Sequence, residues 1–73
     1  MDIKARRVEI EYTNYRGERG RRVIVPTLLY FGSTSWHTEP QWLLSAYDVA
    51  KGAARTFAMR DIHDWVDVKE AVE

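Results

Sequence analysis

The chain contains 73 residues, with 11 basic and 11 acidic side chains and hence a formal net charge of zero at pH 7. That length allows a single domain, residues 1–73, with one small core and only marginal stability of its own. Zero net charge argues against a strong non-specific nucleic-acid binder, and the lack of cysteine excludes disulfides and thiolate metal sites. We expect a cytoplasmic protein without a membrane-spanning segment, because no apolar run reaches about 18 residues.

The charges are unevenly distributed along the chain. Basic side chains are in excess in residues 1–22, and acidic side chains are in excess in residues 61–73. A local basic patch is therefore compatible with a total charge of zero. The acidic tail could cover that patch within one molecule, which would give the tail a regulatory role.

Residues 4–12 alternate in polarity, as a strand with one buried and one wet face does. Val8, Ile10 and Tyr12 share the apolar face, and glutamates occupy the positions between them. Turn-forming residues follow, and we expect an exposed loop that continues through Gly20. The arginines near this loop would then lie at a solvated hairpin tip, or some of them would bind an anion: Arg16, Arg19, Arg21 and Arg22.

A second strand is predicted from Arg22 to Phe31. Pro26 lies in its middle and cannot donate to a strand ladder, so it marks an edge, a bend or a bulge. Such a long interrupted strand predicts the sharp curvature of a small barrel. Because residues 28–31 are apolar at every position, we expect this half of the strand to be the more buried.

Residues 32–41 are too rich in turn formers for a strand and too numerous for a tight hairpin. Trp36 and His37 are unusual in so exposed a segment, because a surface loop rarely contains a tryptophan without a use for it. Two interpretations follow. Trp36 either folds back to cover one end of the barrel or contacts a ligand or partner.

Residues 42–62 predict a hairpin, with polarity alternating on both sides of Lys51-Gly52 and a turn bounded by Asp48 and Gly52. Strand structure is expected to end near Ile62, followed by a turn and a short acidic helix. These elements predict an all-β fold: a small SH3-like or Sm-like curved barrel of four or five antiparallel strands, with a short C-terminal turn or helix.

Five short sequence matches, in the right order, resemble the WYL domain family and span residues 8–62. They are Arg22-x-Ile24-x-Pro26, Trp42-Leu43-Leu44, Tyr47-Asp48, Arg55-x-Phe57-x-Met59 and Ile62. The resemblance implies the same barrel and a ligand-sensing module of bacterial transcription regulators. Such modules are usually fused to a helix-turn-helix, and several bind nucleic-acid or nucleotide-like effectors. Since no helix-turn-helix fits beside the barrel in 73 residues, we expect a free-standing module that acts on a partner or as a subunit.

Two positions depart from the pattern of that family. Leu43 replaces the middle tyrosine, and Asp61 stands where the family has a second arginine, with Arg60 one position earlier. If these residues lie in a strand, neighbours point to opposite faces and Arg60 cannot substitute for the missing arginine. An acidic group at that place would repel an anionic ligand.

The sequence contains no catalytic motif that we can identify, so we expect neither an enzyme nor a bound cofactor. His37 beside Glu39 and His63 beside Asp64 could in principle ligate a metal ion. Two such pairs, about 25 positions apart, arise often by chance. No metal site is predicted.

Arginines interleaved with aromatic residues on a small barrel suit an anionic ligand with flat groups, because guanidinium groups bind phosphates and rings stack on bases. The resemblance implicates Arg22 and Arg55, although Arg55 could instead pair with Asp48 across the turn. Tyr15 is a further possible stacking platform. The candidate ligand-binding residues are Arg22, Arg55, Arg60, Tyr47, Tyr12, Trp36 and His37.

The first hypothesis is a non-enzymatic regulatory module that recognises an anionic ligand, either a nucleotide or single-stranded nucleic acid. The alternative is a protein-interaction or oligomerisation module that uses the aromatic loop 32–41 or a barrel edge. Small barrels can pair edge strands between subunits, and a homodimer would also compensate for the small core.

Overall fold

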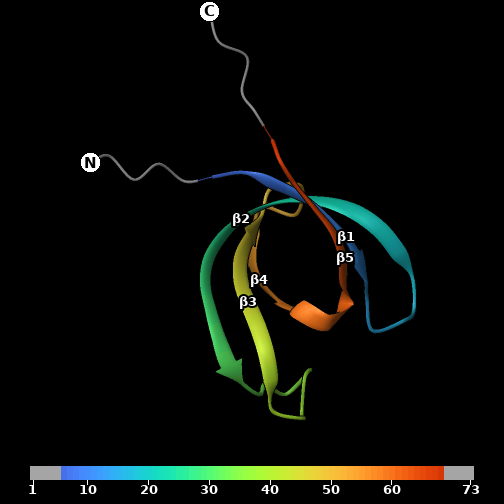
Figure 1. Cartoon of the computed structure of the whole chain (residues 1–73), viewed down its shortest axis with the longest axis vertical. Coiled ribbons are helices and arrows are strands. Elements are labelled where there is room, and N and C mark those ends of the chain that lie inside the picture. The colour runs from blue at the N-terminus through green and yellow to red at the C-terminus, as the bar shows by residue number, and fades with distance from the viewer. Residues whose placement is uncertain (1–5, 69–73) are drawn as a thin grey trace, which may run out of the picture.

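The computed structural model describes residues 6–68, which form five strands and one short 3-10 turn. The strands make a single antiparallel sheet in the order β4-β3-β2-β1-β5, strongly curled and left open between its two outer strands (Figure 1). This confirms the predicted all-β fold of a small curved barrel. The elements are β1 (Val8–Thr13), β2 (Arg19–Gly32), β3 (Gln41–Asp48), β4 (Ala53–Ala58), η1 (Met59–Asp61) and β5 (Ile62–Asp67).

Strand β1 has the predicted alternation, with Val8, Ile10 and Tyr12 buried and the residues between them half-buried. Residues 4–5 of the predicted strand lie outside the described residues. The turn that follows is short because the Asn14 side-chain oxygen accepts the N–H groups of both Arg16 and Glu18. The prediction of a loop through Gly20 is wrong, because β2 already begins at Arg19 and pairs with β1 from there.

Strand β2 changes neighbours at its middle. Its first half pairs with β1, and its second half pairs with β3, with a register shift between Pro26 and Leu28. The proline therefore lies at a bulge, as its missing N–H requires. The predicted burial of the second half is wrong, since Leu28, Leu29 and Phe31 are each more than half exposed. Beyond the bulge, no strand of residues 6–68 pairs with β2 on the side away from β3.

The hairpin of β3 and β4 has the predicted turn. The Gly52 N–H donates to the Asp48 carbonyl oxygen at 2.8 Å, and the Lys51 N–H donates to the Asp48 side chain at 3.2 Å. Gly52 has a φ of +67°, a left-handed conformation that favours glycine.

The C-terminal part differs from the prediction. Instead of ending near Ile62, the chain passes through η1 and continues as β5 to Asp67, which pairs with the outer edge of β1. Sequence alternation alone could not indicate β5, because its pairing with β1 contains a bulge between Glu11 and Tyr12 that breaks the period of two. The predicted acidic helix falls largely on residues 69–73, outside the described residues.

One hydrophobic core fills the inside of the curled sheet. Tyr12 and Phe57 meet edge to face there, with ring centroids 4.9 Å apart. Met59 and Ile62 pack against the core from η1 and the start of β5, which explains why the chain turns back towards β1. The buried members are Val8, Ile10, Tyr12, Ile24, Leu44, Ala46 and Phe57.

Candidate ligand-binding site

A cavity of about 810 Å³ is formed by the β1–β2 turn, the β2–β3 loop and strands β1 to β4. This volume lies within the range of roughly 300–1,000 Å³ that is common for small-molecule sites. Within residues 6–68, Arg55 is the one charged side chain among its lining residues apart from titratable His37, and no carboxylate lines it. The aromatic side chains that line this cavity, which we call the aromatic pocket, are Tyr12, Tyr15, Trp36, His37, Tyr47 and Phe57.

Two loops meet at the rim of the aromatic pocket. Tyr15 from the β1–β2 turn packs on Trp36 from the β2–β3 loop, with ring centroids 5.5 Å apart. The Arg16 guanidinium lies over the Tyr15 ring, 5.6 Å from its centroid. The rim is therefore a series of flat groups that draws together two segments separated in the sequence.

The β2–β3 loop is held in shape by Thr34. Its hydroxyl oxygen accepts the N–H groups of Trp36 and His37, at 3.2 Å and 3.0 Å, and its own N–H donates to the His37 carbonyl oxygen. This local turn positions Trp36 although the Trp36 side chain is 75% exposed. Trp36 thus stands at the rim of the pocket and does not seal the end of the barrel by burying itself.

Tyr12 and Phe57 lie deeper in the aromatic pocket, as members of the core. Burial raises the pKa of the Tyr12 phenol; a backbone group at Ala58 opposes this rise, the charge of Asp61 adds to it, and Arg55 and Arg22 oppose it. Tyr12 is therefore neutral at physiological pH and keeps a hydroxyl donor inside the pocket.

Arg22 does not line the aromatic pocket but binds Asp48, with its Nη1 atom 3.3 Å from Asp48 Oδ2. Asp48 is fully buried, whereas Arg22 is partly exposed. The alternative that Arg55 pairs with Asp48 is wrong. The strand register places Asp48 opposite Ile24 of β2. Arg22 precedes Ile24 by two residues and so lies on the same face of β2, where the buried carboxylate can reach the half-buried arginine.

Arg60 also lies apart from the aromatic pocket, in η1, where its Nη1 atom is 3.6 Å from Glu39 Oε1 and both side chains are well exposed. Of the candidate residues predicted from the sequence, the structure brings together Tyr12, Trp36, His37, Tyr47 and Arg55 at the aromatic pocket. Sequence reasoning missed the contribution of Thr34 and Phe57. The role of Thr34 could have been predicted, because a threonine two and three residues before Trp36 and His37 is typical of a turn capped by a hydroxyl.

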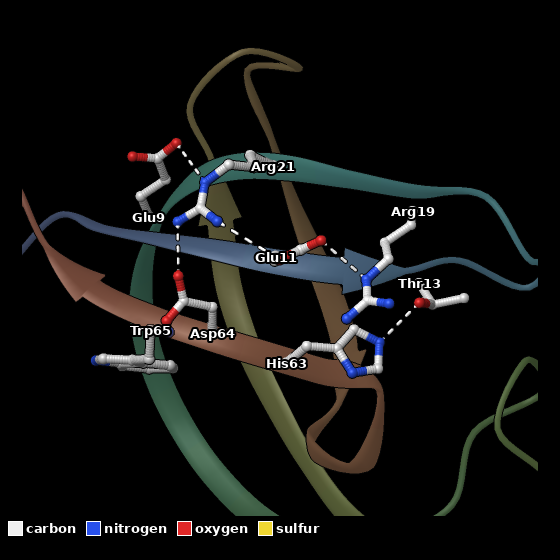
Figure 2. A network of polar contacts seen from close by, with 8 residues as sticks. All are labelled: Glu9, Glu11, Thr13, Arg19, Arg21, His63, Asp64 and Trp65. Atoms are coloured by element: carbon white, nitrogen blue, oxygen red, sulfur yellow. Dashed lines mark hydrogen bonds and ion pairs between the residues drawn. The ribbon is translucent and has the colours of Figure 1, made fainter.

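The opposite face of the sheet carries a network of arginines and carboxylates across β2, β1 and β5 (Figure 2). Arg21 is at its centre, 2.9 Å from Glu9, 3.6 Å from Glu11 and 3.1 Å from Asp64. Arg19 extends the network, with its Nε atom 2.8 Å from the second oxygen of Glu11. The hydrogen bonds to Glu9 and Asp64 raise the pKa of the Arg21 guanidinium.

The prediction that these arginines lie at a hairpin tip is wrong for Arg19, Arg21 and Arg22, which are all in β2. Carboxylates of β1 and β5 face the first two, and Asp67 pairs with Arg6 at 3.3 Å. The excess of basic residues near the N-terminus is therefore matched in part by Asp64 and Asp67 of β5. Much of the acidic tail suggested as a cover, residues 69–73, lies outside the described residues.

A family model of the WYL domain matches residues 3–66 of the 73 residues. The chain belongs to the WYL domain family. WYL domains are regulatory, ligand-binding modules, and this membership agrees with the small curved β fold and its aromatic pocket. No curated protein sequence matches the chain.

The motif residues of this WYL domain have distinct positions. Pro26 is at the bulge of β2, and Leu43, in place of the family's tyrosine, is completely buried in β3. Asp61 lies in η1 and not in a strand, so the argument that Arg60 and Asp61 point to opposite faces of a strand does not apply. Asp61 is not among the residues that line the aromatic pocket, although its charge adds to the rise in the pKa of Tyr12 that burial causes.

Among residues 6–68 of the WYL domain, no group of three His, Cys, Asp or Glu side chains is placed to hold a metal ion. His63 instead lies with its Nε2 atom 2.7 Å from the Thr13 hydroxyl, within hydrogen-bond distance (Figure 2). A helix with the length and apolar character needed to cross a bilayer is absent from this same part of the chain.

Proposed function

We propose that this WYL domain is a non-enzymatic regulatory module that binds an anionic ligand with a flat group, a nucleotide or single-stranded nucleic acid, in the aromatic pocket. The observation that supports this proposal is the gathering of Tyr12, Trp36, His37 and Tyr47 around the exposed Arg55, with no carboxylate among the described lining residues. A guanidinium binds phosphate oxygens in pairs, and exposed rings accept stacked bases.

In this proposal the side chains have different roles. Arg55 binds the anionic group, while Trp36 and Tyr47 provide stacking surfaces. His37 and the neutral Tyr12 hydroxyl donate or accept hydrogen bonds. Arg22 and Arg60 contribute positive potential near the pocket but no direct contact, because each already has a carboxylate partner.

The experiment is a titration of the protein with a short mixed-sequence single-stranded oligonucleotide and, separately, with adenosine monophosphate. Tryptophan fluorescence is followed in a Trp42→Phe, Trp65→Phe background, so that Trp36 is the one remaining tryptophan. We expect saturable quenching that weakens as salt is raised, since binding of a phosphate releases counterions.

Arg55→Gln tests the site directly. A charge-assisted hydrogen bond contributes about 1.5–3 kcal/mol, so the variant should bind roughly 10- to 100-fold more weakly. Arg60→Gln is the matched control, because it removes the same charge from an exposed arginine outside the pocket. Equal affinities of the two variants, or no quenching at low salt, would contradict the proposal.

A second candidate function, a protein-interaction or oligomerisation module, is favoured by the exposed apolar side chains at the end of the β2–β3 hairpin. The two functions are compatible in one domain. In both cases we propose that this domain works in the cytoplasm and acts on a partner or as part of a homo-oligomer.

A further inference from the structure

We propose that Tyr15 and Trp36 separate to admit the flat group of the ligand and then hold it between their rings. The aromatic pocket would thereby select an anion joined to a planar ring over the anion alone. This inference rests on the proposed function and adds to it a role for Tyr15 and a basis for specificity. Neither residue belongs to the five sequence matches to the WYL family, so this aromatic slot is a feature of the loops of this chain.

The two rings of the aromatic slot meet at the rim of the aromatic pocket, at the end of β1 opposite to the one where the Val68 N–H donates to the Arg7 carbonyl oxygen. Their centroids are 5.5 Å apart and their planes are tilted by 41°, so the rings form a wedge and not a parallel stack. A flat group between two rings needs about 7 Å between them, twice the contact distance of about 3.5 Å between carbon atoms. The centroids therefore have to move apart by about 1.5 Å to admit it.

Little opposes this separation. Tyr15 is 73% exposed and Trp36 is 75% exposed, so most of each ring is already in water and moving them apart uncovers little further apolar surface. Within residues 6–68 these two side chains take part in one hydrogen bond, in which the Tyr15 hydroxyl accepts the Nε–H of Arg16 at 3.3 Å. A flat group between the rings replaces one tilted contact with two stacked ones.

The backbone beneath each ring is held in place, so that rotation of the side chains is enough to open the aromatic slot. The Asn14 side-chain oxygen accepts the N–H groups of Arg16 and Glu18, both at 2.9 Å. The Thr34 hydroxyl oxygen caps the loop that carries Trp36. Exposed side chains change rotamer on the fastest timescale of side-chain motion, and loops that are already ordered lower the cost of binding.

The chemistry of the aromatic slot determines which group it accepts. Both of its walls are uncharged rings, whereas Arg55 is the permanently charged side chain among the described residues that line the pocket. A nucleobase stacks on aromatic rings whatever its identity, because every base has a flat face. A sugar phosphate can reach Arg55 but has no flat face to place between Tyr15 and Trp36. The ring of the ligand should therefore contribute to affinity separately from its phosphate.

The test compares adenosine monophosphate with ribose 5-phosphate, which has the same sugar and phosphate but no base. Titrations of the full chain followed by NMR chemical shifts give both affinities, including weak ones. The parent chain should bind adenosine monophosphate more tightly. Tyr15→Leu should weaken the binding of adenosine monophosphate roughly 5- to 150-fold, the range for loss of one base–aromatic stack, and leave that of ribose 5-phosphate unchanged.

Two variants are matched controls. Tyr15→Phe keeps the ring and removes the hydroxyl, so it should bind adenosine monophosphate as the parent does. Tyr30→Leu makes the same substitution in β2, at a residue that does not line the aromatic pocket, and should change neither affinity. Binding of ribose 5-phosphate by Tyr15→Leu with the affinity of the parent also demonstrates that this variant is folded.

Nuclear Overhauser contacts in the parent chain provide a measurement that needs no variant. Contacts between the Tyr15 and Trp36 rings should disappear at saturation with adenosine monophosphate. Contacts from each of the two rings to the adenine protons should replace them. Ring-to-ring contacts that persist at saturation would overturn the proposed separation.

Failure of this inference can be distinguished from failure of the proposed function. If the parent binds neither ligand, or if Arg55→Gln binds both as the parent does, the proposed function is wrong and the inference is wrong with it. If Arg55→Gln weakens both ligands but Tyr15→Leu binds adenosine monophosphate like the parent, the aromatic slot alone is wrong. An equal loss of both ligands in Tyr15→Leu also overturns the inference, because Tyr15 would then act on the anion or on the fold.

Discussion

Asp48 is a fully buried carboxylate that combines two tasks, binding Arg22 and capping the β3–β4 turn through the Lys51 N–H. Removing the cation from such a pair leaves a buried charge without full compensation. Arg22→Gln should therefore lower the free energy of unfolding by about 1–3 kcal/mol. In a domain of this size, each kilocalorie corresponds to a fall of about 4–8 °C in the thermal midpoint.

Thermal unfolding followed by tryptophan fluorescence checks this prediction, with Arg60→Gln as the control whose partner, Glu39, is exposed. Adding Asp48→Asn to Arg22→Gln should recover part of the loss, because the amide carries no buried charge. Equal midpoints for Arg22→Gln and Arg60→Gln would contradict the structural role of the pair. The result also matters for binding studies. If an Arg22 variant binds a ligand more weakly, the cause would be the loss of fold stability and not the loss of a ligand contact.

Tyr12 predicts a specific dependence of stability on pH. Its pKa in the folded protein is raised above the ordinary value of 10.0 by burial. Above that ordinary value the unfolded tyrosine loses its proton while the folded one keeps it, so the unfolded state binds fewer protons and stability falls as pH rises. Below it, both states are protonated and Tyr12 contributes no pH dependence.

Urea unfolding at several pH values between 9 and 11 measures this effect. Tyr12→Phe keeps the ring that packs against Phe57 and removes the ionising group. The loss of stability with rising pH should be smaller in this variant than in the parent. Parallel profiles of the parent and Tyr12→Phe would mean that Tyr12 ionises equally in the folded and unfolded states.

At the scale of elements, the β3–β4 turn depends on one backbone conformation. Gly52 has a φ of +67°, which costs a residue with a side chain about 1–2 kcal/mol, although a Cβ atom there would meet nothing closer than the Tyr47 hydroxyl at 3.7 Å. Gly52→Ala should therefore destabilise the domain by about that amount through backbone strain and not through a clash.

Gly20→Ala is the comparison within the same chain. Gly20 lies in β2, has no positive φ, and a Cβ atom there would meet nothing within 4 Å. This substitution should leave stability unchanged or raise it by about 0.4–1 kcal/mol, because it restricts the unfolded chain. Urea midpoints of the two variants give the difference, and a loss as large for Gly20→Ala as for Gly52→Ala would argue against the backbone explanation.

Strand β5 is attached to the rest of the sheet by side chains as well as by its backbone. Beyond its backbone ladder with β1, β5 is bound by the network around Arg21, by the contact of His63 with Thr13 and by the pair of Arg6 with Asp67 (Figure 2). Single exposed ion pairs contribute little, and a shared network contributes more than isolated pairs do. Arg21, which contacts three carboxylates, is therefore the residue that joins β2, β1 and β5 on the outer face.

For the whole molecule, the curled sheet separates two kinds of surface. The outer face carries matched charges, whereas the inside contains the core and the aromatic pocket with Arg55. The end of the β2–β3 hairpin extends beyond the part covered by β1 and leaves apolar side chains exposed.

Local signals in the sequence were sufficient for several elements. Alternation over Val8 to Tyr12 and turn residues at Asn14 and Gly52 were predicted and observed. An edge, a bend or a bulge was predicted at Pro26, and the structure has the bulge. Each depends on residues within a few positions of one another, which fix backbone conformation and face. Five of the seven candidate ligand-binding residues, which were chosen for the chemistry of their side chains, line the aromatic pocket.

What only the tertiary structure decided are the properties that depend on which strand lies beside which. The second half of β2 is apolar but exposed, and within residues 6–68 strand β1 pairs only with the first half. Residues 62–67 form a strand because β1 has an open edge there. Arg22, and not Arg55, pairs with Asp48 because the register between β2 and β3 brings it there. The sequence therefore determined the local conformations, and long-range pairing determined burial, charge partners and the position of the pocket.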